Sequence, residues 1–380
     1  MPSTRQEFPD RLRGIALLGI VLVNAPFMGI SADGLTAASV SGAANWLSAF
    51  LILALAEGKF YLLFSFLFGY SSSFILRDNS VPNRRRYLRR LFALFVFGLI
   101  HAIFFFIGDI LITYSVLGVL LFAISRSSDR ALRWWTRGSI AVAGLFIVAF
   151  ASLLTFIPEG ESSMDGLQQA LASGTFLEAA GARLAVLPEV LIFLLFVQAP
   201  MAFAAFTLGL RASRIRLLAN PMEHRTLWKR LMIWGWLIGL PLQLIAASLQ
   251  MSGITSGTRY TIPEAAGLAL GFISAPILSA GYVGLIGIVL ARQPGFLATM
   301  APAGRMSLTV YIGESVLLTL LFCGYGLGFF GDWGAFGVML AAIGSWVVLS
   351  FFALLWAQRF SQGPLEMVLA RMTGKHKHVT

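Results

Sequence analysis

Long apolar runs, separated by short polar or basic segments, recur along the whole chain. Many of them exceed about 18 residues, the length that is typical of a membrane-spanning helix. The runs are continuous rather than alternating, so they predict helices and not the strands of a membrane barrel. We predict ten spans, at about residues 12–30, 58–76, 88–107, 109–126, 138–157, 186–210, 230–250, 265–291, 305–324 and 334–357. The first run lacks a convincing small-residue cleavage site, so we expect it to be a span and not a cleaved signal.

Residues 44–57 are also apolar, and the pattern leaves three alternatives for them: a re-entrant segment, an interfacial helix or a further span. A further span would invert the orientation of every later one. The distribution of basic residues decides whether residues 44–57 are a further span, because cytoplasmic loops are enriched in Lys and Arg. With ten spans and a cytoplasmic N-terminus, 25 of the 28 basic residues are cytoplasmic, and only Lys59, Arg183 and Arg259 lie outside. We therefore expect both termini in the cytoplasm.

The composition supports a single integral membrane domain over residues 1–380. The chain is 58% hydrophobic and only 12% charged, with a mean hydropathy of +0.81. The fold class predicted is an all-α polytopic helix bundle. The net charge of +11 lies in the cytoplasmic loops, which favours contact with anionic lipid over nucleic acid. The single cysteine, Cys323, excludes an intrachain disulfide framework and a multi-cysteine metal site.

The apolar stretch from Leu91 to Gly118 carries two ionisable residues, His101 and Asp109. Such residues are energetically costly in a membrane and usually face protein, water or a substrate path. We expect His101 near the middle of the third span and Asp109 at its outer mouth. The alternative is structural, with His101 hydrogen-bonded between helices and Asp109 in an interfacial turn.

Asn24 and Glu314 fall at a depth comparable to that of His101 on two other predicted spans. A histidine can act as a general base near neutral pH, Glu314 or Asp109 could orient its ring, and Asn24 could stabilise an oxyanion. The alternative for Asn24 and Glu314 is ordinary hydrogen bonding between helices.

Further binding residues are predicted from their positions along the spans. Near the candidate catalytic residues we expect substrate contacts from Tyr311 and Ser315 in span 9, and from Glu57 and Lys59 at the outer start of span 2, although the last two could simply pair with each other. At the cytoplasmic helix ends the candidates for binding donor phosphates are Arg13, Arg85, Arg86 and Arg305. The alternative for these arginines is anchoring in the lipid headgroup layer.

Two further features concern the packing of the helices and the one long loop. Four glycines, Gly69, Gly98, Gly118 and Gly209, lie within spans, where a missing side chain permits close helix approach. The only long outer loop, residues 158–185, carries acidic residues with Gly and Ser, and we expect it to be partly helical.

Six motifs in order resemble the YeiB family of bacterial inner-membrane proteins, and the resemblance runs from about residue 11 to 372. The motifs are LRGIALLGIVLVN (12–24), GKFYLLFSFLFGY (58–70), RRRYLRRL (84–91), GLIHAIFFFIGDILITYSVLG (98–118), APAGRMSLTVYIGES (301–315) and GPLE (363–366). The family has a C-terminal domain of unknown function, expected here over about residues 225–375 after an N-terminal half at about 11–126. It implies a location in the bacterial inner membrane.

The family is similar, more remotely, to the transmembrane acyltransferase superfamily. One group of these enzymes begins with a similar RG…VN stretch, in which Asn24 matches their Asn. Their catalytic His follows shortly afterwards, whereas this chain has no His between 25 and 100. His101 is therefore the candidate, because His224, His376 and His378 fall in cytoplasmic segments. In addition, Glu314 stands where the family pattern is closer to TNY…QS. Glu in place of Gln adds a charge, so the resemblance does not carry a role over to this position.

The resemblance implies transfer of an acyl group from a cytoplasmic donor to a hydroxyl or amine near the outer face. Acyl-CoA would be a co-substrate, with no tightly bound cofactor, and the acceptor would be a small molecule or a lipid. One buried His without a Cys partner argues against a metal, although Asp109 and Glu314 leave it open. A proton-coupled transporter and a non-catalytic lipid- or partner-binding protein are the alternatives. Donor, acceptor and oligomeric state stay open.

Overall fold

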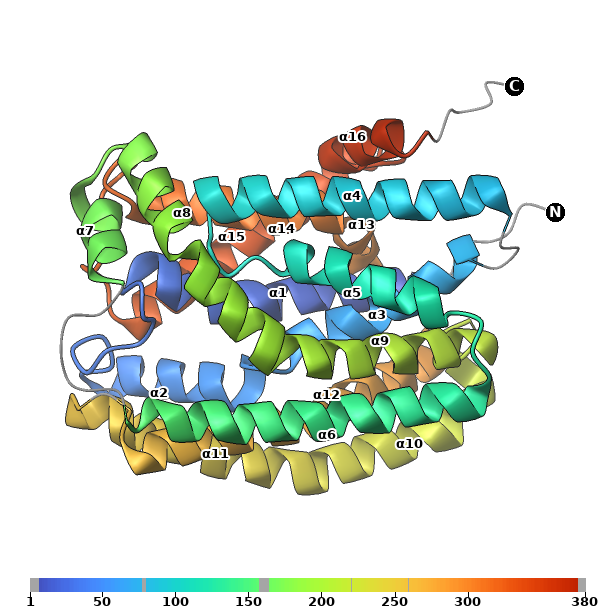
Figure 1. Ribbon diagram of the computed structural model, residues 1–380, viewed down its shortest axis with the longest axis horizontal. Coiled ribbons are helices and arrows are strands. Elements are labelled where there is room, and N and C mark those ends of the chain that lie inside the picture. Colours follow the sequence, from blue (N-terminus) through green and yellow to red (C-terminus); the bar gives the residue numbers. More distant parts are fainter. Residues whose placement is uncertain (1–6, 77–79, 157–163, 220, 259, 375–380) are drawn as a thin grey trace.

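The computed structural model describes residues 7–76, 80–156, 164–219, 221–258 and 260–374, and the regular structure of this part of the chain is entirely helical (Figure 1). Its longer elements are α1 (Glu7–Gly29), α3 (Phe60–Leu76), α4 (Val81–Phe104), α5 (Ile110–Ile124), α6 (Asp129–Leu154), α8 (Phe176–Phe193), α9 (Ala199–Arg214), α10 (Arg225–Trp234), α11 (Leu240–Ser256), α12 (Ile262–Arg292), α14 (Ser307–Phe322) and α15 (Ala335–Trp356). The predicted all-α bundle is confirmed.

Within the described residues, eight helical runs are long and apolar enough to cross a membrane. Residues 298–305, which include α13 (Ala301–Arg305), form a bent pair with α14, with an angle of 83° at the junction, and this pair makes a ninth if it counts as one span. The fourth predicted span, 109–126, corresponds to α5, which is apolar but only 15 residues long. Each predicted span thus has a helical counterpart, and the chain is a polytopic membrane protein.

The apolar stretch 44–57 forms the first half of the second crossing. Helix α2 (Ala43–Leu51) and the π-helical turn η1 (Ile52–Ala56) continue towards α3, and together they make a 34-residue run. Gly58 breaks the run with a φ of +76°, a left-handed conformation that glycine adopts without steric cost. The break places Lys59 in the interior, 1% exposed, and not at the outer start of the span where we expected it.

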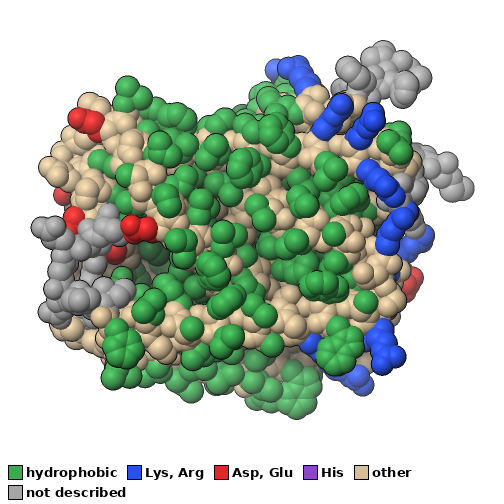
Figure 2. All heavy atoms as spheres, in the orientation of Figure 1, with side chains coloured by type: hydrophobic (Ala, Val, Ile, Leu, Met, Phe, Trp, Pro, Cys, Tyr) green, Lys and Arg blue, Asp and Glu red, His purple; other side chains and the backbone are tan. Residues whose placement is uncertain are grey.

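Charged side chains divide between the two ends of the bundle (Figure 2). Lys and Arg gather at the end where α4 begins and α9 finishes, which we name the basic end, while acidic side chains are more frequent at the opposite end. Between them the surface is mostly apolar, with large side chains such as Leu145 (67% exposed) and Phe92 (65%). An apolar belt between polar ends is what a bilayer requires.

All four glycines predicted to permit close packing do so. A Cβ atom on Gly69 or on Gly209 would overlap backbone atoms of the facing helix, because α3 and α9 cross there. A Cβ on Gly98 would meet Asp109 and Ile112, and one on Gly118 would meet Leu91.

The long loop predicted at residues 158–185 is partly helical, as expected. Helix α7 (Asp165–Ser173) lies within it, and α8 begins at Phe176 after a capping box formed by Thr175 and Glu178. Residues 157–163 of the loop lie outside the described residues.

Candidate functional site

His101 and Asp109 form a buried pair. His101 lies in the last turn of α4, and Asp109 is the N-cap of α5 after a four-residue connection. The Nδ1 atom of His101 is 2.8 Å from Oδ2 of Asp109, while Oδ1 of Asp109 accepts a hydrogen bond from the Ile112 backbone N–H at 2.9 Å. Because Gly98 has no side chain, α5 can approach α4 at this level. Asp109 therefore both caps a helix and orients the imidazole.

The burial of Asp109 and the bounds of α4 place these two residues more exactly than the sequence does. Asp109 is 1% exposed and packs against Gly98 of α4. His101 is near the end of its helix and not in the middle, because α4 starts at Val81 and includes the basic run before the apolar stretch. Arginine is a good helix former, so the helix extends beyond the boundary that hydropathy indicates.

Tyr311 joins the pair from a distant part of the sequence. Its ring lies 4.8 Å from the imidazole of His101, centroid to centroid, and its hydroxyl is 3.5 Å from Oδ2 of Asp109. Glu314 is buried one turn further along α14. His101, Asp109 and Tyr311 thus form one contiguous cluster, with Glu314 on the neighbouring turn of the same helix.

Two members of this region have buried polar atoms without a hydrogen-bond partner among the described residues. They are Nε2 of His101 and both carboxyl oxygens of Glu314. When Nδ1 carries the proton and donates a hydrogen bond to the Asp109 carboxylate, Nε2 keeps its lone pair and can accept a proton. The arrangement is the one that a general base needs, because one ring nitrogen is held and the other is free.

A cavity of about 1330 Å³ connects this region with the basic end. Tyr311 and three residues of α5, Ile110, Leu111 and Tyr114, contribute to its wall in the interior. Six arginines also line it, namely Arg13, Arg90, Arg126, Arg214, Arg216 and Arg305, together with the carboxylates of Asp10 and Glu366. We call this cavity the vestibule. Its size is sufficient for a drug-sized or larger ligand.

The arginines of the vestibule differ in the contacts that they already make with the rest of the protein. Arg13 pairs with Asp10 at 2.9 Å and also donates to Ser71. Arg90 lies over the ring of Phe68, 5.4 Å from its centroid. Arg305 stands at the bend between α13 and α14, and its Nε atom is buried without a partner among the described residues.

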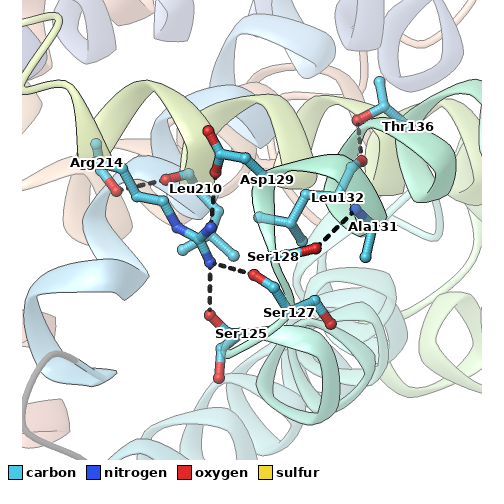
Figure 3. Close-up of polar contacts among 10 residues, drawn as sticks. Ser125, Ser127, Ser128, Asp129, Ala131, Leu132, Thr136, Leu210 and Arg214 are labelled. Carbon is cyan, nitrogen blue, oxygen red and sulfur yellow. Dashed lines mark hydrogen bonds and ion pairs between the residues drawn. The ribbon is translucent and has the colours of Figure 1, made fainter.

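Arg214 holds the edge of the vestibule together (Figure 3). Its guanidinium donates to Asp129 at 2.7 Å and to the carbonyl oxygens of Ser125 and Ser127 at 3.1 and 2.8 Å. These contacts join the end of α9 to the turn between α5 and α6. Since these partners lie in that turn and at the first residue of α6, we assign Arg214 a structural role.

The other predicted residues lie apart from the vestibule or are not joined to the His101 cluster. Arg85 and Arg86 line a separate groove, described below. Glu57 accepts a hydrogen bond from Gln250 at 3.0 Å, and the ammonium of Lys59 donates to the Leu53 carbonyl at 2.8 Å, so both stabilise the break between η1 and α3.

Asn24 is half-buried in α1, and among the described residues its amide makes no hydrogen bond. Ser315 is buried in α14, where its carbonyl accepts from Thr319. Of the other histidines, His224 is in the short helix η3 (Pro221–His224), and His376 and His378 lie outside the described residues. The described residues contain no group of three or more His, Cys, Asp or Glu side chains placed to hold a metal ion.

Among the vestibule residues that sequence reasoning missed are Arg90, Tyr114 and Glu366. Tyr114 could have been found, because it is a polar residue in the apolar stretch from Leu91 to Gly118 that carries His101 and Asp109. Glu366 belongs to the GPLE motif, but its partners are nearly sixty residues away. Its carboxylate accepts hydrogen bonds from the backbone N–H of Leu308 at 2.8 Å and from the hydroxyl of Thr309 at 2.6 Å. It thereby fastens the helix α16 (Pro364–Met372) to the start of α14.

This fastening is expected to depend on pH. Burial raises the pKa of the Glu366 carboxyl above its usual 4.5, although the hydrogen bonds from Leu308 and Thr309 oppose the shift. The folded protein then binds this proton more tightly than the unfolded one, so the contribution of Glu366 to stability falls as pH rises from about 4.5. Thermal unfolding from about pH 4 to about pH 8 checks this, since Glu366→Gln should remove that part of the pH dependence. Equal pH profiles for both proteins would contradict it.

Fold and site together define a polytopic helical membrane protein with a buried His–Asp pair near an arginine-lined vestibule. Residues 212–376 match the family described as "Protein of unknown function (DUF418)". The chain is 28% identical to the uncharacterized protein YxaH of Bacillus subtilis, covering 94% of this chain and 91% of YxaH. It is 26% identical to the uncharacterized protein YeiB of Escherichia coli, covering 96% and 95%. The resemblance to the YeiB family that the sequence motifs indicate is therefore confirmed, and residues 212–376 carry the DUF418 match.

Proposed function

We propose that the protein is a transmembrane acyltransferase that takes an acyl group from a cytoplasmic donor such as acyl-CoA. The acceptor is a hydroxyl or amine, on a small molecule or a lipid, that approaches from the outer side. In this proposal the basic end and both termini face the cytoplasm of a bacterial cell, and the bundle lies in the inner membrane. The positive-inside rule supports that orientation.

The observation that carries the proposal is the vestibule. Arginine side chains line it at the basic end, and Tyr311, which contacts both His101 and Asp109, lines it in the interior. Arginine binds phosphate groups with charge-assisted hydrogen bonds, so a phosphate-bearing donor fits these walls. An acyl chain or thioester would extend past the aromatic and aliphatic lining towards Tyr311.

In the proposed reaction, Nε2 of His101 removes a proton from the acceptor while the acceptor oxygen or nitrogen attacks the thioester carbonyl carbon. A bond forms between the acceptor and that carbon, and the carbon–sulfur bond breaks. The leaving thiolate takes the proton back from His101. Asp109 holds the ring and stabilises its charged form, and Asn24 is assigned to the developing oxyanion.

Binding of acetyl-CoA and longer acyl-CoAs to the purified full chain in detergent tests the donor. Isothermal calorimetry should show saturable binding in the micromolar range. Failure of every acyl-CoA to bind would overturn the proposal and favour transport.

Arg305 offers the sharpest variant for this test, because its Nε atom has no partner among the described residues. A hydrogen bond from a charged donor is worth about 1.5–3 kcal/mol, so Arg305→Gln should raise the Kd of acyl-CoA by at least about tenfold. Arg130→Gln removes an exposed charge at the same end without touching the vestibule and should leave the Kd within about twofold. Equal effects of both variants would mean that only the general positive charge matters.

Proton-coupled transport is the second candidate, and the broken second crossing favours it. Interrupted membrane helices often hold substrates or ions near the membrane midplane. The break here brings the charges of Glu57 and Lys59 near each other, and Lys59 is buried inside the bundle. Solute flux that follows a proton gradient and ignores acyl-CoA would select this candidate.

A further inference from the structure

The sequence RRRYLRR puts five arginines into the first turns of α4, and the vestibule uses only Arg90. Three others line a second, smaller groove of about 340 Å³; these are Arg85, Arg86 and Arg89. The start of α4 forms one wall, with Val81, Pro82 and Asn83, and the end of α16 forms the other, with Thr373 and Gly374.

The described chain supplies no counter-charge for these arginines. None of Arg85, Arg86 and Arg89 makes an ion pair or a side-chain hydrogen bond with a described residue. They also stand near the positive end of the helix dipole of α4, where cations are disfavoured. The groove is therefore complementary in charge to an anion.

Apolar surface continues from the groove along both helices. On α4, Leu88, Phe92 and Phe95 recur at helical spacing and are 42%, 65% and 38% exposed. On α16, Val368 and Met372 are one turn apart and are 41% and 40% exposed. A soluble anion would leave this apolar surface uncovered, whereas a lipid could bind it with its acyl chains. We propose that the groove binds the headgroup of an anionic phospholipid, whose acyl chains lie along the exposed face of α4.

Native mass spectrometry of the full chain in a nonionic detergent tests the proposal, with phosphatidylglycerol as the probe and phosphatidylcholine as the neutral comparison. Each basic residue near an anionic headgroup contributes several-fold in affinity, so the triple variant Arg85→Gln, Arg86→Gln, Arg89→Gln should raise the apparent Kd of phosphatidylglycerol by at least about tenfold. Phosphatidylcholine should bind more weakly and respond little.

A matched triple variant controls for net charge. Arg130, Arg133 and Arg137 are exposed on α6 at the same end and line neither cavity. Replacing all three with Gln should change the Kd less than about twofold. Equal losses in the two triple variants, or equal binding of the two lipids, would overturn the proposal.

Two further measurements keep the result interpretable. Inorganic phosphate at millimolar concentration should not displace phosphatidylglycerol, and displacement would point to a soluble anion as the occupant. If the groove triple variant does not fold, Arg89→Gln alone should still weaken lipid binding measurably. An unchanged affinity in that variant would refute the site.

Discussion

Replacing His101 with Gln is expected to lower the rate of acyl transfer by about 10²–10⁴-fold, the usual contribution of a general base. The imidazole is buried, one of its nitrogens is held by Asp109, and the other is free to accept a proton. Glutamine is similar in reach but cannot take up a proton near neutral pH. Turnover of labelled acyl-CoA with an identified acceptor would measure the effect.

Donor binding separates loss of chemistry from loss of structure. His101→Gln should bind acyl-CoA with an unchanged Kd, because His101 does not line the vestibule. His224→Gln, a change in a short helix away from the His–Asp pair, should keep full activity. Full turnover by the His101 variant would refute its role as the base.

Asp109→Asn tests the orienting role separately. The amide oxygen can still accept the hydrogen bond from the Ile112 N–H and cap α5. The amide carries no charge, however, and cannot stabilise a protonated imidazole as a carboxylate does. Turnover should therefore fall while the thermal stability changes little.

Most of the fold could be predicted, because the predicted spans other than the short α5 are apolar runs of the length that a bilayer demands. The errors lie at the basic helix ends. The apolar runs begin at about residues 88 and 138, but α4 already starts at Val81 and α6 at Asp129. Serine caps at Ser80 and Ser128 mark those starts, and arginine continues a helix where its charge can reach the headgroups.

The candidate site could be predicted only in part, for a different reason. His101 and Asp109 are close in sequence, and their pairing needs only the short turn between α4 and α5. Tyr311 approaches them from about two hundred residues away, so only the packing of α14 shows that contact. Arg85 and Arg305 are both basic residues at helix ends, and no local pattern tells which of them lines the vestibule.

We expect the largest effect on stability from a substitution at the crossing of α3 and α9. Gly69 faces the backbone of Phe206, and Gly209 faces the backbone of Phe66 and Tyr70, so the two helices touch without intervening side chains. Close contacts between small residues supply much of the packing energy between membrane helices. Because the neighbouring atoms belong to the backbone, no side-chain rotation can make room for a methyl group.

Gly209→Ala should therefore destabilise the protein by about 1–3 kcal/mol or more, the usual result of forcing an extra carbon into a packed interior. Thermal unfolding in detergent, followed by loss of monodisperse protein, measures the shift. Gly144→Ala on α6 is the matched control, since a Cβ there would meet nothing within 4 Å. If both variants unfolded at the same temperature, the tight crossing of α3 and α9 would contribute nothing to stability. The crossing of α3 and α9 forms one wall of the bundle beside the vestibule. A loss of thermal stability in Gly209→Ala alone would therefore show that this contact helps to hold the site in shape.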